Sequence, residues 1–137
     1  MTALSKDKDT KMQLGDVQEF PVLASTIIYA GALVCLNAAG YAVPGATATT
    51  LVAAGRADAQ ADNSAGANAA INVKVRAGVF RFENSASSDE ITIAEIGDNC
   101  YIVDDQTVAK TDGSSSRSVA GKVVQIDSQG VWVRLGL

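Results

Sequence analysis

Short apolar runs separated by turn-forming residues fill the last third of the chain, residues 100–137. In the final run, 131–135, three apolar residues share one face of an extended strand, whereas Trp132 and Arg134 share the other face. The preceding segment, 127–130, contains Asp, Ser and Gly and is typical of a tight turn. These features predict antiparallel strands joined by turns, and such strands need a second sheet to cover their apolar face.

Two segments upstream have the composition of that second sheet. Residues 27–36 form an uninterrupted apolar run, which is typical of a strand buried on both faces, and the turn 37–40 separates it from a second short run, 41–43. In 49–62, small apolar residues alternate with polar ones, so that one face consists almost wholly of Ala. Ala also favours helix, but Gly55 and the period of two favour a strand.

The longest predicted strand, 71–83, changes phase at Gly78, where the apolar positions move by one residue. Such a slip at a glycine is typical of a β-bulge, which turns a strand from one sheet into another. Residues 91–96 are compatible with a short strand or one helical turn, ended by Gly97. The sequence therefore predicts an all-β fold, a jelly-roll-like antiparallel β-sandwich that forms a single domain over residues 20–137.

The first 19 residues differ from this pattern and predict an extended N-terminal arm. They show neither an apolar stripe of helical period nor a strict alternation, and the cations Lys6, Lys8 and Lys11 alternate with carboxylates. Two interpretations stay open for residues 1–19, a disordered tail and an arm that docks on a neighbouring subunit.

Composition excludes several classes of function. The formal net charge is −4, which provides no electrostatic footprint for DNA or RNA. The chain has no histidine, so the usual general base and the commonest metal ligand are missing. Cys35 and Cys100 lie in apolar runs without a metal-binding spacing; two buried thiols are favoured, and a disulfide stays open.

Residues 20–55 contain no charged residue, a feature that is also compatible with a membrane segment. A spanning helix needs about 20 continuous apolar residues, but Ser, Thr, Asn, Gly and Pro interrupt this segment, and its Ile and Val residues favour strands. The start of the chain also lacks the apolar core of a secretory signal. A buried hairpin is the preferred interpretation, with a membrane helix as the alternative.

No catalytic, cofactor-binding or metal-binding motif is found in the sequence. Adjacent carboxylates at Asp104 and Asp105 are typical of a turn, and 127–130 lacks the further ligands of a calcium loop. Trp132 beside Arg134 is compatible with a carbohydrate platform, an interface anchor or simple packing. We therefore expect a protein that is not an enzyme. The candidate partner-binding residues are Lys6, Lys8, Lys11, Phe20, Trp132 and Arg134.

Several segments, taken in order, resemble a known class of virion proteins. They are 29–34, 36–45, 97–108, 118–121 and 130–133. The set is similar to small head proteins of tailed bacteriophages and prophages of the Mu-like and Bordetella-podophage type, and the resemblance extends from about residue 3 to the C-terminus. It implies a capsid cement, or decoration, protein with a jelly-roll fold that lies outside the shell and clamps neighbouring major capsid subunits. It brings no active site.

The resemblance sets expectations for partners and location. The partner would be the phage major capsid protein, and the location the outer surface of the virion after synthesis in the host cytoplasm. We expect a homodimer rather than a trimer, without direct contact to nucleic acid or membrane. Two alternatives stay open: a carbohydrate-binding or adhesin-type module of a phage tail, which would use Trp132, and a holin-like membrane protein.

Overall fold

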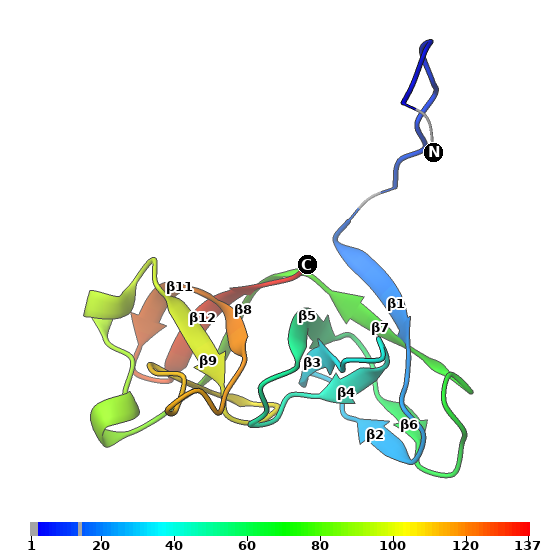
Figure 1. The fold of residues 1–137 in the computed structure, drawn as a ribbon. Coiled ribbons are helices and arrows are strands. Elements are labelled where there is room, and N and C mark those ends of the chain that lie inside the picture. The colour runs from blue at the N-terminus through cyan, green and yellow to red at the C-terminus, as the bar shows by residue number, and fades with distance from the viewer. Residues whose placement is uncertain (1–2, 14) are drawn as a thin grey trace.

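Twelve strands and two single-turn 3-10 helices make up the part of the chain that the structure describes, residues 3–13 and 15–137 of a computed structural model (Figure 1). The strands are β1 (Val17–Pro21), β2 (Thr26–Ile28), β3 (Leu33–Leu36), β4 (Ala42–Pro44), β5 (Val52–Ala57), β6 (Ala61–Asn63), β7 (Asn72–Arg76), β8 (Gly78–Asn84), β9 (Asn99–Ile102), β10 (Thr107–Ala109), β11 (Val119–Asp127) and β12 (Gly130–Leu135). The 3-10 helices are η1 (Ser87–Asp89) and η2 (Ile93–Glu95).

The strands form two main units that lie side by side (Figure 1). One is a five-stranded antiparallel sheet with the order β1-β7-β5-β3-β4. The other is a small closed barrel, β10-β8-β12-β11-β9, in which β10 and β8 form a parallel pair. Strands β2 and β6 form a separate two-stranded sheet. The prediction of an all-β, sandwich-like fold is confirmed; jelly-roll connectivity, its finer part, stays a prediction.

Strand β3 separates two hydrophobic cores. Leu33 and Cys35 belong to the first core, whereas Val34, between them, belongs to the second. The first core is Leu33, Cys35, Phe82, Ile91, Cys100, Ile102, Val108, Ala120, Val123, Val131, Val133 and Leu135. The second core is Val22, Ile28, Ala32, Val34, Ala42, Ala54, Ala57, Ala61, Val73 and Val75. Because side chains alternate across a strand, β3 is buried on both faces, as its apolar sequence predicts.

The apolar run 27–36 is nevertheless not one strand, and this part of the prediction is wrong. Strand β2 ends at Ile28 and β3 begins at Leu33. Between them the backbone amide of Ala32 donates to the carbonyl of Tyr29 (3.1 Å), and Gly31 has a φ of +86°. Glycine reaches this left-handed conformation at little cost, so the chain turns here although no polar residue marks the turn.

Residues 49–62 form strands, as predicted, but their single Ala face is not observed. Strand β5 ends at Ala57, and only 61–63 resume extended pairing, as β6. A register shift against β3 interrupts the alternation, so that Ala53 packs on the first core and Ala57, four residues further on, packs in the second. The bulge puts small residues on both faces of β5, which lies between the two cores.

The phase change at Gly78 marks the passage from the sheet to the barrel, as predicted, but residues 71–83 form two strands, β7 and β8, and not one strand with a bulge. Strand β7 pairs with β1 and β5 in the sheet, whereas β8 pairs with β12 and β10 in the barrel. Gly78 has a φ of +156°, a conformation that other residues rarely adopt. The ambiguous segment 91–96 contains the helical turn η2, in which Thr92 and Glu95 form a capping box.

The N-terminal arm is shorter than predicted. Strand β1 begins at Val17, and the amide of Ala77 donates to the carbonyl of Asp16 (2.8 Å), so residues 16–19 belong to the body. Residues 3–13 are exposed and lead away from the body (Figure 1). Residues 1, 2 and 14 of the predicted arm lie outside the described residues.

The two cysteines are buried and unpaired, which confirms the prediction of two thiols in the interior. Both belong to the first core. Burial raises the pKa of each thiol to about 12. In 3–13 and 15–137, no helix is long and apolar enough to cross a bilayer.

Candidate partner-binding surfaces

Three of the six candidate residues, Lys6, Lys8 and Lys11, lie on the exposed arm. The Lys11 ammonium lies 3.3 Å from the Asp9 carboxylate, and both side chains are more than nine-tenths exposed. An ion pair so open to solvent contributes little to stability. The arm therefore presents charged side chains and exposed backbone without being fixed by its own ion pairs.

The candidate residue Phe20 packs on the body of the protein and stays partly exposed. It lies in β1 opposite Val73 and packs, half-buried, against the second core. The free part of β1 is its backbone: β7 pairs with one edge of the strand, and no strand covers the other edge among the described residues. Such an open edge presents unpaired amide and carbonyl groups that can accept a further strand.

The remaining candidates, Trp132 and Arg134, lie on the outside of the barrel, on β12. Their neighbours in register on β8 are Arg81, opposite Trp132, and Val79, opposite Arg134. On the other side, β11 places Gln125 beside Trp132 and Lys122 beside Arg134. We call this surface the barrel face; its residues are Val79, Arg81, Lys122, Gln125, Trp132 and Arg134.

Trp132 is fixed by polar contacts on the barrel face. Its indole Nε1 donates to Oδ2 of Asp127 (2.8 Å), and the Arg81 guanidinium lies over the ring, 5.7 Å from the centroid. The pKa of Asp127 is lowered, first by the hydrogen bond from Trp132 and then by the backbone amide of Gln129. Asp127 therefore stays ionised and holds the indole in one orientation.

Arg81 and Lys122 were not among the residues that the sequence predicted. Lys122 was missed because β11 has a register shift between Val123 and Gln125. Counting back from the turn 127–130 without this bulge would place Lys122 opposite Leu135, whose side chain points inward. Arg81 comes from a strand far away in sequence, and only the alternation of Arg81 with Phe82 could have indicated an outward position.

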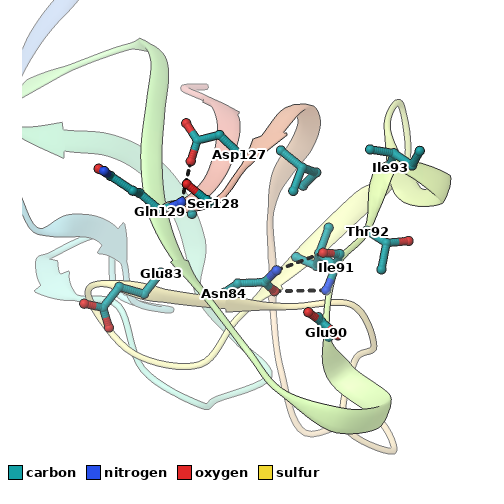
Figure 2. A pocket seen from close by; sticks show the side chains of 11 residues that line it. Glu83, Asn84, Glu90, Ile91, Thr92, Ile93, Asp127, Ser128 and Gln129 are labelled. Atoms are coloured by element: carbon teal, nitrogen blue, oxygen red, sulfur yellow. Dashed lines mark hydrogen bonds between the residues drawn. The ribbon is translucent and has the colours of Figure 1, made fainter.

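An open hollow of about 670 Å³ lies at one end of the barrel, beside the turn between β11 and β12 (Figure 2). Glu83, Glu90 and Asp127 contribute carboxylates to its lining. The Asn84 side chain bonds both backbone groups of Ile91 (2.8 and 2.9 Å), which fixes one wall. In the described residues, no three Asp, Glu or Cys side chains are arranged to hold a metal ion.

A second charged cluster stabilises the junction between the sheet and the barrel. Asp58 accepts hydrogen bonds from Arg56 (2.7 Å) and from Arg76 (3.1 and 3.2 Å). The Arg56 guanidinium also lies 4.7 Å from the centroid of the Phe80 ring, which belongs to the barrel strand β8. The pKa of Asp58 is lowered, first by Arg76 and then by Arg56. Each charged side chain of this cluster contacts another member of it. We therefore interpret the cluster as structural.

Comparison of the chain with known protein families, with curated proteins and with solved structures gives no match.

Proposed function

We propose that this chain is a structural virion protein that binds the outside of a phage head and cements neighbouring major capsid subunits, without catalysing a reaction. The observation that carries the proposal is the exposed arm, residues 3–13, which precedes the open edge strand β1 of a compact β body. The resemblance of segments 29–34, 36–45, 97–108, 118–121 and 130–133 to phage head proteins supports the same role.

The arm and the edge provide what a cement protein needs. A body of this size contacts a limited area, whereas an arm reaches further: when fully extended at ~3.3 Å per residue, residues 3–13 could span at most roughly 35 Å. The backbone of the arm can add a strand to a sheet edge of a capsid subunit, and the unpaired edge of β1 can accept one. Exposed lysine pairs add little, so attachment relies on backbone pairing and on many copies.

Deletion of residues 1–13 tests the proposal. The deletion stops before Asp16, because the carbonyl of this residue bonds the body. We expect a folded body by circular dichroism that cosediments poorly with undecorated heads built from the phage major capsid protein proposed as the partner. In the full chain, the change of Lys6, Lys8 and Lys11 to Glu should weaken attachment more mildly, and mainly at low salt. Saturation of the heads by the truncated body at the same concentration as the full chain would overturn the role of the arm.

A further inference from the structure

The barrel face carries an excess of positive charge on a protein that is acidic overall. The chain has 11 Lys and Arg residues against 15 Asp and Glu residues. In the part of the chain that the structure describes, none of Arg81, Lys122 and Arg134 forms an ion pair, although other surface arginines do. All three are exposed. The charges of Lys122 and Arg134 are therefore available to a partner, whereas the charge of Arg81 is partly balanced by the nearby Asp127 carboxylate.

Strand register brings the three cations into one patch. Arg134 on β12 lies directly opposite Lys122 on β11. On β8, Arg134 lies opposite Val79, which is two positions from Arg81. Directly opposed residues are ~5 Å apart and diagonal ones ~7–8 Å apart. The barrel strands β8, β12 and β11 thus hold the three charges within the footprint of a few acidic side chains.

The contacts of Trp132 distinguish between the possible anions. The ring that would stack a base or a sugar is already partly covered by Arg81, and its N–H is used by Asp127. Asp127 and Glu83 lie at the turn end of the patch, where they would repel a continuous phosphate backbone. Separate carboxylates avoid both obstacles, and an arginine fork binds a carboxylate with two parallel hydrogen bonds.

We propose that the barrel face docks an acidic protein surface, with Arg81, Arg134 and Lys122 pairing to Asp and Glu side chains of the partner. This proposal rests on the proposed function only for the identity of the partner, which would be a capsid subunit. Trp132 holds Arg81 in place and seals the centre of the contact.

The sole tryptophan of the chain, Trp132, provides a direct readout. Poly-L-glutamate is titrated into the full-length protein at low salt, and the fluorescence of Trp132 is followed. We expect a saturable change that high salt abolishes. The triple change of Arg81, Lys122 and Arg134 to Gln should weaken binding at least tenfold.

A charge-matched control uses exposed residues outside both the patch and the arm. Changing Lys74 and Lys110 to Gln together with Gln60→Glu alters the net charge by the same amount and should leave the titration unchanged. Arg81→Lys with Arg134→Lys keeps the charge but removes both forks, and should give intermediate binding. Circular dichroism establishes that each variant is folded.

The proposal is overturned if Trp132 shows no saturable response, if the control weakens binding as much as the triple variant, or if a single-stranded oligothymidylate or heparin binds more tightly than poly-L-glutamate. None of these measurements uses a capsid. Loss of arm-dependent head binding would therefore remove the proposed function and leave this result standing.

Discussion

Asp58 compensates for an unfavourable pair of residues in the sheet. Arg56 and Arg76 lie directly opposite each other on β5 and β7, where like charges destabilise pairing. The carboxylate of Asp58 contacts both guanidinium groups, and Asp16 lies 3.7 Å from Arg76. Two arginines can therefore occupy neighbouring strands at the junction with the barrel.

We expect Asp58→Asn to lower the melting temperature at neutral pH, because Arg56 loses its anionic partner and Arg76 keeps only the more distant Asp16. The pKa of Asp58 is lowered below 3.8 in the folded state, so its contribution is present above 3.8 and is lost as the pH falls through the folded-state value. The difference between variant and wild type should thus shrink in acid. Thermal unfolding at neutral pH and at an acid pH measures the difference in melting temperature. Asp9→Asn on the exposed arm is the control. An equal difference at both pH values would contradict this account.

The two buried thiols should be unreactive in the folded protein. With pKa values of about 12, Cys35 and Cys100 have almost no thiolate at pH 8, and neither side chain is exposed. We expect no reaction with a chromogenic aromatic disulfide until denaturant is added, when both thiols should titrate. Fast modification of one thiol in the native protein would show that the first core opens locally.

At the scale of the elements, the sequence predicts strands better than it predicts where they pair. The phase change at Gly78 was visible because alternating apolar residues flank it on both sides, and a change of sheet shifts that alternation. The turn at 29–32 was not visible because it contains only apolar residues and Gly31. Closure of the barrel depends on the parallel pairing of β8 with β10, and local alternation contains no information about such a partner.

The residues of the barrel face were also only partly predictable from the sequence. Trp132 and Arg134 share a face because side chains alternate along one strand, which the sequence reveals directly. Lys122 and Arg81 join them only through a bulged register and a pairing that is distant in sequence. The sequence does not reveal that the half-buried ring of Phe20 packs on the second core, because the residues of that core come from distant strands.

Strand β3 should be the most sensitive strand to truncation of its side chains. Leu33 is fully buried in the first core, and its backbone bonds both Gly45 and Asp105. We expect Leu33→Ala to cost about 2–5 kcal/mol, the range for a leucine removed from a close-packed core. Denaturant titration measures the loss, and Leu4→Ala on the exposed arm is the matched control. A cost below about 1 kcal/mol would show that the two cores can collapse around the cavity.

At the scale of the whole molecule, the barrel is closed and the sheet remains open at β1. Two copies that pair their β1 edges would cover these backbone groups in an isologous dimer, so we expect a homodimer rather than a trimer. Light scattering across a range of concentrations tests this. A monomer at high concentration would exclude a pre-formed dimer and leave dimerisation on the head as the remaining route.

The way in which the arm enters β1 has a mechanical consequence. The arm continues upward from the start of β1 in Figure 1, and β1 pairs with β7 from Val17 to Pro21. A pull on the arm along the strand axis would act on all of these backbone hydrogen bonds in shear, at the same time. A pull at right angles would break them one after another, as in unzipping. A tether attached in this way resists a force along its own direction far better than its number of hydrogen bonds suggests.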